Sequence, residues 1–482
     1  MKKTLTEQKE NGRIYTPVYI VNNILDLSNY YGKSILKKHI IDNSCGDGAF
    51  LCKIVERYCT VAIDNNMTLS ELKNDLEIYI HGIELNSVEA NKCIINVSNI
   101  AFLFGVENVN WDIICDDATT VNKFNGKIDF VFGNPPYVRV HNLGSSFNSV
   151  KKFTFAQNGM TDLFIVFYEL GLRMLSKNGV LGYITPSSFF NSLAGSYMRK
   201  VLVNDNLIDK IVDLKHFQAF NATTYTTIVI LKKNKQNNNI SYYQFDEQKK
   251  IPYYVDTLTP NDFFICGNFY FSKKENLLIL SKIFHNLGEC DVSVKNGYAT
   301  LCDDVFISDF EFSSDYIIPV IKSSRGTTSK MFYPYDKEGN LILESKLKED
   351  YNMYRYLTQN KNKLLKRSNE KDNNLYWYAF GRSQAIKDTF KDKLSINSLL
   401  RDESDLKFVD VAAGVGVYGG LYLVSESIPA EDIKKALKSS EFMTYISLLG
   451  KYKSGGYYTF SSKDLKIYLN YKFAYNRGLF VC

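Results

Sequence analysis

The sequence predicts an α/β fold, a doubly wound and mostly parallel sheet followed by a second, α+β domain. Three observations support this prediction. Apolar strand-like runs alternate with helix-like segments through the first half. A polar, charged run at residues 232–239 then ends the alternation, and short aromatic-rich segments mixed with polar turns follow it. We therefore expect two domains, residues 1–240 and 241–482.

The elements of the first half follow one another in the order that parallel sheets require. Apolar runs predict strands at residues 39–42, 78–85, 111–115, 127–132, 180–185, 208–214 and 226–231. Apolar residues at helical spacing predict helices at residues 49–58, 87–104 and 162–175. Asn86 or Ser87 can cap the second helix, Lys177-Asn178-Gly179 can stop the third, and Pro186 ends the strand after it.

Composition excludes several classes of protein. Apolar residues make up 45% and aromatic residues 14% of the 482, so the chain can bury a sizeable core. The nine cysteines form no CxxC and the five histidines no HxxH or HxxxH, which argues against a zinc site and against a disulfide framework. Neither a signal peptide nor a membrane-spanning run is evident. We expect a reduced, cytoplasmic protein with no metal and no membrane partner.

Charge is concentrated in one part of the second half. The whole chain has a net charge of +6, whereas residues 321–400 hold 16 basic and 9 acidic residues, a net of +7. A local basic excess is typical of a protein that binds a polyanion. A lysine-rich solvated surface would give the same count.

Residues 42–51, DNSCGDGAFL, form the first motif with chemical content. A strand leads into a loop with Gly46 and Gly48, where the backbone can approach a ligand closely, and a helix follows. The loop is not GxGxxG, so phosphate binding is weakly supported. It fits a loop that curls around the amino-acid tail of S-adenosylmethionine, with Asp42 near the ammonium or sulfonium group. An ordinary strand–helix turn is the alternative.

Acidic residues follow the next two strands. Glu84 at the end of the second strand can bind ribose hydroxyls through charge-assisted hydrogen bonds. Asp117, after the third strand, can bind an adenine amino group, and Asp116 is the competing choice. Taken alone, Glu84 is better explained as a solvated strand end, and a capping role is the alternative for Asp116 and Asp117.

Gly133-Asn134-Pro135-Pro136-Tyr137 follows the fourth strand directly. The two prolines predict a rigid, extended turn. Such a turn holds the Asn134 amide oxygen and the Pro135 carbonyl as two acceptors for one exocyclic amino group, whose nitrogen can then attack an electrophilic methyl group. Tyr137 offers a flat ring for stacking on a heterocycle. A purely structural turn is the alternative.

Together these motifs resemble the gamma class of DNA adenine-N6 methyltransferases, the TaqI-like type II modification methylases. The resemblance is close over residues 12–231 and looser beyond, through residues 377–384 and 455–460. It implies the class I methyltransferase fold (Rossmann-like), S-adenosyl-L-methionine as cofactor, and a C-terminal target-recognition domain. It also implies methylation at N6 of an adenine flipped out of double-stranded DNA, in a restriction-modification system.

The resemblance also assigns roles to residues. It implies catalytic roles for Asn134, Pro135, Pro136, Tyr137 and Phe220, with Phe217 as the alternative second stacking ring. It implies cofactor contacts from Tyr15, Thr16, Asp42, Cys45, Gly46, Gly48, Glu84, Asp117, Ala118 and Asn134. Candidate DNA contacts are Lys322, Arg325, Lys330, Lys363, Lys366, Arg367, Arg382 and Gln384.

Arg382 and Gln384 suit base edges as well as phosphates.

Cytosine-N4 methylation is an alternative reaction, although enzymes of that kind commonly have Ser where Asn134 stands. RNA or protein-glutamine methylation is a further alternative, since NPPY loops also act on those substrates. A non-enzymatic DNA-binding subunit is the least supported interpretation, because the NPPY residues are intact. No nuclease pattern precedes the catalytic half, so we expect any cognate restriction endonuclease to be a separate protein.

Overall fold

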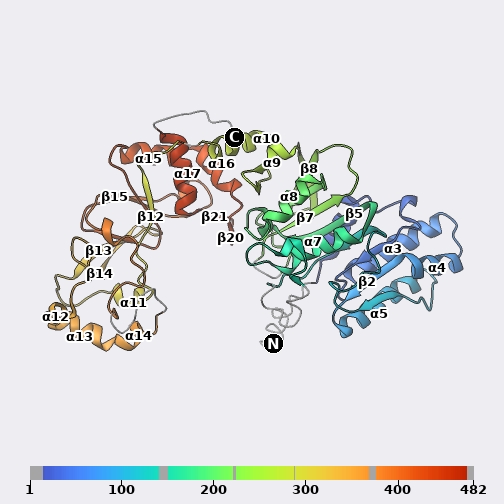
Figure 1. Cartoon of the computed structure of the whole chain (residues 1–482), viewed down its shortest axis with the longest axis horizontal. Helices are drawn as coiled ribbons and strands as arrows, with labels where there is room; N and C mark the ends of the chain where they lie inside the picture. The colour runs from blue at the N-terminus through green and yellow to red at the C-terminus, as the bar shows by residue number, and fades with distance from the viewer. Residues whose placement is uncertain (1–14, 140–149, 221–223, 287, 368–375, 475–482) are drawn as a thin grey trace. The chain divides into compact units, whose positions relative to one another are not determined.

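The computed structural model describes residues 15–139, 150–220, 224–286, 288–367 and 376–474. It divides into two compact units, Met1–Leu278 and Ile279–Cys482, which are described separately (Figure 1).

The first unit is built on a sheet of nine strands in the order β3-β2-β1-β4-β5-β7-β6-β8-β9. Neighbouring strands from β3 through to β5 are parallel, and β7 runs antiparallel to both β5 and β6. The strands are β1 (Ile40–Asp42), β2 (Ile80–Glu84), β3 (Asp112–Cys115), β4 (Ile128–Gly133), β5 (Leu175–Pro186), β6 (Ile208–Asp213), β7 (Thr226–Lys232), β8 (Ile240–Asp246) and β9 (Ile251–Leu258). All seven strands expected in the first half are present, with ends shifted by a few residues.

The expected boundary near residue 240 is wrong for the fold. Strand β8 pairs in parallel with β6, with Lys210 opposite Ser241, and β9 pairs with β8. The polar run at 232–239 therefore connects two strands of the same sheet, and the division of the chain falls after Leu278. A solvated connection between two strands has the same composition as a linker between domains.

Helices cover both faces of this sheet (Figure 1). They are α2 (Val18–Leu27), α3 (Ala49–Asp64), α4 (Leu69–Tyr79), α5 (Ser87–Leu103), α7 (Leu163–Met174), α8 (Ser196–Asn204), α9 (Pro260–Phe263) and α10 (Lys274–Phe284), of which α10 crosses the division between the units. A Cβ at Gly182 of β5 would lie 2.8 Å from Ile24 of α2, whereas Leu181 lies against Gly171 of α7. Since successive strand residues point to opposite faces, α2 and α7 lie on opposite sides of the sheet.

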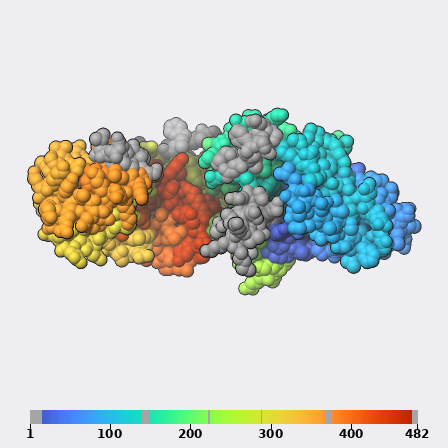
Figure 2. Space-filling view, turned by 90° about the horizontal axis from the view of Figure 1, so that it is seen from below, coloured from blue at the N-terminus to red at the C-terminus, as the bar shows by residue number. Residues whose placement is uncertain are grey.

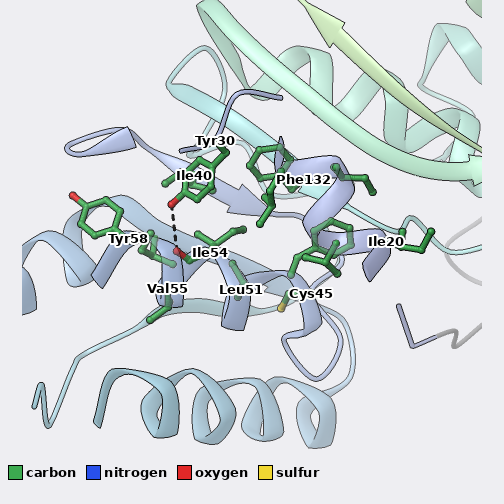
Figure 3. Packing of buried hydrophobic residues seen from close by; sticks show 14 of the residues in the cluster. Ile20, Tyr30, Ile40, Cys45, Leu51, Ile54, Val55, Tyr58 and Phe132 are labelled. Carbon is green, nitrogen blue, oxygen red and sulfur yellow. Dashed lines mark hydrogen bonds between the residues drawn. The ribbon is translucent and has the colours of Figure 1, made fainter. Parts of the chain in front are cut away.

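The core on the α2 side joins residues that are far apart in the sequence. Ile20, Ile54 and Phe132 are fully buried in it, and the Tyr30 hydroxyl donates to the Ile54 carbonyl at 3.4 Å (Figure 3). Burying such a side chain stabilises a fold by about 1.5–3 kcal/mol. Helix α2, for which the sequence analysis made no prediction, is therefore part of the core that packs against the sheet.

Two further local differences have clear physical causes. Residues 60–77, for which no helix was predicted, continue α3 and then form α4, which Thr68 and Glu71 begin with a capping box. Helix α7 ends at Met174, and β5 begins at once. Gly179, expected to help stop that helix, lies within β5, where a Cβ would come within 2.8 Å of the Ile128 carbonyl oxygen.

The second unit is α+β, as expected. It contains sheets of four strands (β12-β19-β15-β17) and three strands (β14-β13-β18 and β16-β21-β20). Its strands are β12 (Ser293–Asn296), β13 (Ile317–Lys322), β14 (Thr327–Phe332), β15 (Lys393–Ile396), β16 (Leu399–Leu400), β17 (Phe408–Val411), β18 (Gly416–Tyr418), β19 (Leu421–Val424), β20 (Tyr452–Lys453) and β21 (Tyr457–Thr459). Its helices are α11 (Asp303–Phe306), α12 (Glu344–Leu347), α13 (Tyr351–Gln359), α14 (Lys361–Leu365), α15 (Ala430–Leu437), α16 (Ser440–Leu448) and α17 (Ser462–Phe473).

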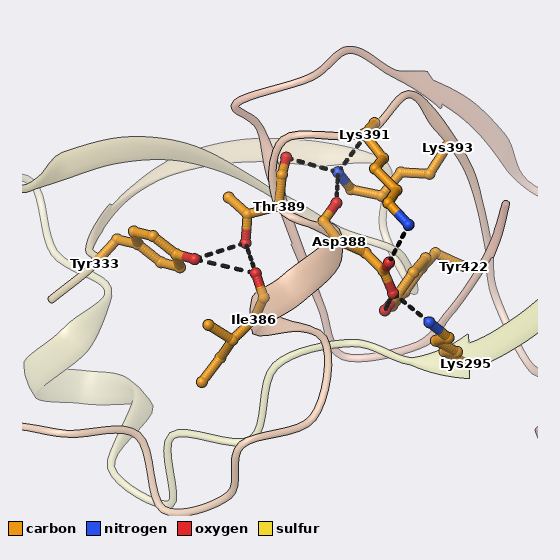
Figure 4. A network of polar contacts seen from close by, with 8 residues as sticks. All are labelled: Lys295, Tyr333, Ile386, Asp388, Thr389, Lys391, Lys393 and Tyr422. Carbon is orange, nitrogen blue, oxygen red and sulfur yellow. Dashed lines mark hydrogen bonds and ion pairs between the residues drawn. The ribbon is translucent and has the colours of Figure 1, made fainter. Parts of the chain in front are cut away.

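A network of polar contacts around the buried Asp388 helps to hold this unit together (Figure 4). The Asp388 carboxylate forms ion pairs with Lys295 at 2.6 Å and Lys391 at 3.3 Å and accepts a hydrogen bond from Tyr422 at 2.8 Å. The Lys393 ammonium donates to three backbone carbonyls, and burial lowers its pKa to about 8. Each charge is thus matched inside the fold, so we assign this cluster a structural role.

No helix within the described ranges is both long and apolar enough to cross a membrane. Over the same residues, no group of His, Cys, Asp or Glu side chains is arranged to hold a metal ion, and the cysteines are free thiols.

Candidate active site

A cavity of about 510 Å³ opens at the carboxyl ends of β1, β2, β3 and β4. Ligand sites of doubly wound sheets occur at this edge. The cavity brings together ten of the residues expected to form the site: Tyr15, Thr16, Asp42, Cys45, Gly46, Glu84, Asp117, Ala118, Asn134 and Pro136. Four expected residues do not line it: Gly48, Pro135, Tyr137 and Phe220.

The glycine loop shapes one wall of the cavity. Cys45 donates its backbone N–H to the Ile83 carbonyl at 3.0 Å, which ties the loop to the end of β2. Gly48 begins α3 with φ +95°, and a Cβ there would lie 2.9 Å from Cys93 Sγ. Gly48 is thus needed for close packing of α3 on α5, and its cofactor contact remains a prediction that the cavity lining does not support.

Glu84 holds two loops at once. Its Oε2 accepts the Gly46 backbone N–H at 3.0 Å, and its Oε1 accepts that of Asn86 at 2.8 Å. Each carboxylate oxygen can accept a second hydrogen bond, so the half-buried side chain can also bind hydroxyl groups of a ligand. The sequence indicated the acid at this strand end but not its role in fixing the loop.

Asp42 is 2% exposed, and its environment changes its chemistry. Burial, together with the nearby carboxylates Glu84 and Asp47, raises the pKa of Asp42 to about 8, although the Ser44 backbone N–H donates to its Oδ1 at 3.0 Å. Gly133 makes this arrangement possible, because a Cβ there would lie 2.9 Å from the same oxygen. Asp42 therefore carries a proton at neutral pH until a positive charge approaches it.

Asp116 and Asp117 both line the cavity, and both support the local turn. Asp117 Oδ1 accepts from the backbone N–H of Thr119 at 2.9 Å and from its hydroxyl at 2.7 Å. Asp116 Oδ1 accepts the Asp117 backbone N–H at 2.7 Å. Both carboxylates thus stabilise the turn after β3, and the choice between them as a ligand contact stays a prediction.

The NPPY turn places its residues on two sides. Asn134 faces the cavity, where its Nδ2 donates to Thr16 Oγ1 at 3.2 Å. Tyr137 turns away from the cavity, donates its hydroxyl to the Ile184 carbonyl at 3.3 Å, and lies 6.3 Å from the Phe220 ring with an interplanar angle of 71°. Burial raises the pKa of Tyr137, so the phenol stays neutral.

The two candidate stacking rings have different partners. Phe220 is 7% exposed and contacts Tyr137. Phe217 instead stacks on Phe245 at 5.0 Å and lies 4.2 Å from the Lys250 ammonium. Phe220 is thus the ring beside the NPPY turn.

The cavity is strongly acidic. Among the described residues that line it, none is Lys, Arg or His, and six carry carboxyl groups: Asp42, Asp47, Glu84, Glu89, Asp116 and Asp117. Glu89 is ion-paired with Lys92 at 3.0 Å. Asp47 and Glu89 were not predicted to line the site, although Asp47 lies within the glycine-loop motif and Glu89 lies in the first turn of α5. Such a lining disfavours phosphate groups and favours a ligand with positive charge.

Of the candidate DNA contacts, some are exposed to solvent and others are half-buried. Arg325, Lys330, Lys363, Lys366 and Arg382 are exposed, and Lys363 is ion-paired with Asp304. The segment of α12, α13 and α14, orange in Figure 2, lies at the molecular surface. Lys322 and Gln384 are half-buried, and Gln384 donates its amide to the Gly297 carbonyl at 2.6 Å.

The prediction that Arg367 contacts DNA is wrong. Arg367 is 7% exposed, and its guanidinium donates to the backbone carbonyls of Thr300, Trp377 and Ala379 at 2.7–2.9 Å. Its buried guanidinium stabilises the second unit through these hydrogen bonds and is not available at the surface. The sequence could not distinguish it from its exposed neighbour Lys366.

Comparison with known proteins supports the family resemblance. Residues 54–220 match the model of the Eco57I restriction-modification methylase family. The type II methyltransferase M.BstVI of Geobacillus stearothermophilus is 29% identical over 249 residues, 48% of this chain and 43% of that protein. The type II restriction enzyme and methyltransferase RM.Eco57I of Escherichia coli is 25% identical over 345 residues, 59% of this chain and 34% of that protein. The chain thus spans less than half the length of these relatives.

Solved structures show the same fold. The type IIL restriction-modification enzyme MmeI, solved in complex with DNA, superposes with a TM-score of 0.62 at 14% identity, over 92% of this chain and 63% of that one. The expected fold class, a doubly wound and mostly parallel sheet with a second α+β domain, is confirmed. Over residues 54–220, the chain is thus similar to the Eco57I restriction-modification methylase family.

Proposed function

We propose that this chain transfers a methyl group from S-adenosyl-L-methionine to N6 of an adenine flipped out of double-stranded DNA. The observation that carries the proposal is the position of Asn134. Its amide lies on the wall of an acidic cavity, and the aromatic pair Tyr137–Phe220 lies on the other side of the same turn.

The residues of the cavity fit S-adenosylmethionine. This cofactor supplies an electrophilic methyl group on a positively charged sulfonium, and it contains no phosphate. The carboxyl groups of the lining suit the positive charges of the sulfonium and ammonium groups. In this proposal Glu84 binds the ribose hydroxyls, and Asp117 or Asp116 binds the adenine amino group; the support is that all three line the cavity.

The turn can prepare an amino group for transfer. The Asn134 amide oxygen and the Pro135 carbonyl would each accept a hydrogen bond from one N–H of the adenine amine and leave the nitrogen lone pair free to attack the methyl group. The bond from that methyl group to sulfur would break with its electron pair going to sulfur, which releases S-adenosylhomocysteine, and the nitrogen would lose one proton to water. Oriented acceptors of this kind act through electrostatic stabilisation and positioning, and no strong base is required. Stacking of the extruded base on both Tyr137 and Phe220 would require one ring to turn, because their planes now meet at 71°. Each such contact would return about 1–3 kcal/mol toward the cost of unstacking.

Exposed basic residues of the second unit are the proposed DNA contacts. Arg325, Lys330, Lys366 and Arg382 have no ion-pair partner among the described residues, and the half-buried Lys322 lies 5.6 Å from the ring of Tyr418. Phosphates are the most frequent partners of such side chains in DNA complexes.

The test is methylation of DNA by the purified full-length chain, read by mass spectrometry of the nucleosides. We expect N6-methyladenine. We also expect Asn134→Ala to lower the rate about 100-fold or more, with a cofactor Kd within about twofold of the wild type. The matched control is Asn99→Ala, an exposed asparagine on α5. N4-methylcytosine would replace the adenine assignment, and methylated RNA or protein with unmodified DNA would contradict the proposed substrate.

A further inference from the structure

The contact between Asn134 and Thr16 joins residues that are 118 positions apart in the sequence. Asn134 Nδ2 is the donor and Thr16 Oγ1 the acceptor, at 3.2 Å. Thr16 is 9% exposed, so water competes little for this hydrogen bond. The contact fixes one end of the Asn134 amide beside the cavity.

The orientation of an amide decides its chemistry. The oxygen and nitrogen of an Asn side chain lie on opposite sides of Cγ, so an amide whose nitrogen points at Thr16 directs its oxygen away from Thr16. If the group turned over, its NH2 would take the place of the oxygen. An amino group presented to that position would then meet a donor instead of an acceptor, and its hydrogens would be repelled.

Thr16 is held firmly enough to impose this orientation. Pro17 follows it with φ −58° and forms the N-cap of α2, and its carbonyl accepts the backbone N–H groups of Ile20 and Val21. Ile20 and Val21 are fully buried in the core on the α2 side. The position of the Thr16 hydroxyl is therefore set by the packing of a whole helix.

We propose that Thr16 is a positioning residue, which holds the Asn134 amide with its oxygen directed at the amino group to be methylated. This inference rests on the proposed function. It differs from the cofactor contact that the sequence resemblance implies for Thr16, because the hydroxyl acts through Asn134. It also gives α2 a role in catalysis at a distance from the reacting atoms.

Two substitutions separate the hydroxyl from the rest of the side chain. Thr16→Val keeps the shape and removes the hydroxyl, and Thr16→Ser keeps the hydroxyl and removes a methyl group. Thr227→Val is the matched control, since Thr227 is a buried threonine of β7 whose hydroxyl donates to the Val212 carbonyl at 2.9 Å, outside the cavity lining. The measurements are the single-turnover methylation rate at saturating cofactor and DNA, and the cofactor Kd by calorimetry.

We expect Thr16→Val to lower the single-turnover rate about 10–100-fold, as when a hydrogen-bond partner that orients a metal-ligating side chain is removed. Thr16→Ser should stay within about threefold of the wild type, and the cofactor Kd of both variants within about twofold. Thr227→Val should leave the rate unchanged.

A Thr16→Val enzyme with wild-type rate and a weaker cofactor Kd would overturn the inference and return Thr16 to a cofactor contact. Equal losses in Thr16→Ser and Thr16→Val would also overturn it, in favour of a packing role. If the wild type itself transfers no methyl group to DNA, the proposed function fails, which differs from an active wild type that is insensitive to Thr16→Val.

Discussion

Phe220 and Phe217 lie three residues apart, yet their rings have different neighbours. Phe220 contacts Tyr137 of the NPPY turn, whereas Phe217 packs on Phe245 beneath Lys250. Substitution by Leu removes the aromatic face and keeps most of the volume, so stability should fall by less than about 1.5 kcal/mol in either case. We expect Phe220→Leu to lower the methylation rate about tenfold, in line with the stacking energy of one base. Phe217→Leu should leave the rate unchanged in the same assay, and the reverse result would exchange the two roles.

The buried Asp42 makes stability depend on pH. Its pKa of about 8 in the folded chain lies above the ordinary value of 3.8, so between these values the folded state holds a proton that the unfolded state has released. The resulting stabilisation is fully present below about pH 4 and is lost as the pH rises through about 8. The free energy of unfolding should fall by up to about 1.4 kcal/mol per pH unit from this group alone.

Asp42→Asn tests this assignment, because the amide oxygen can still accept from Ser44 and does not titrate. In urea titrations at pH 5, 6, 7 and 8, the variant should gain stability relative to the wild type as the pH rises. Parallel profiles for the two proteins would show that Asp42 is ionised in the folded chain.

At the level of elements, Gly46 and Gly48 of the connection from β1 to α3 contribute unequally to stability. Gly46 has φ +53° and open space around its Cβ position, whereas Gly48 has φ +95° and Cys93 Sγ at 2.9 Å. A left-handed conformation costs a non-glycine residue about 1–2 kcal/mol, and overpacking adds about 1–3 kcal/mol. We expect Gly48→Ala to lower the free energy of unfolding by about 2–4 kcal/mol and Gly46→Ala by about 1 kcal/mol, measured by urea denaturation. Equal losses of stability in the two variants would mean that α5 shifts to make room for a methyl group at position 48 without a cost in free energy.

The same element shows what the sequence could predict. The strand, the glycine loop and the helix follow from local patterns of apolar and small residues, and so does the position of the NPPY turn after β4. Helix α2 was not predicted, and β8 and β9 were placed in the wrong domain, because their assignment depends on pairing with residues distant in the sequence. Arg367 failed for a related reason, since only the folded chain shows whether a guanidinium meets backbone carbonyls or solvent.

At the level of the whole molecule, the exposed basic residues of the second unit predict how DNA binding depends on salt. We expect Lys366→Gln with Arg382→Gln to reduce the slope of log K against log salt by about 0.9 for each phosphate that is no longer neutralised. Lys435→Gln, an exposed lysine outside residues 321–400, is the control. Arg367→Gln should instead lower the thermal stability of the protein, because it leaves buried carbonyls without their donor. An unchanged slope in the double variant would assign its charges to a solvated surface.

The division of the chain after Leu278 has a direct consequence for where the first unit can be cut. Tyr242 of β8 and Leu258 of β9 are fully buried, and Arg199 of α8 donates to the Gly267 carbonyl at 2.8 Å and to Asn268 Oδ1 at 3.0 Å. A chain that ends at residue 240 would lack these interactions and expose the edge of β6, and an exposed edge strand promotes aggregation.

We therefore expect residues 1–278 to give a monomer that unfolds cooperatively and binds the cofactor within about threefold of the full chain's Kd. Residues 1–240 should aggregate or unfold at a temperature lower by about 10 °C or more, since several buried side chains are removed, each worth about 1.5–3 kcal/mol. Size-exclusion chromatography, thermal denaturation and calorimetry of both fragments decide the question. Equal stability of the two fragments would mean that β8 and β9 only cover the edge of a sheet that is complete without them.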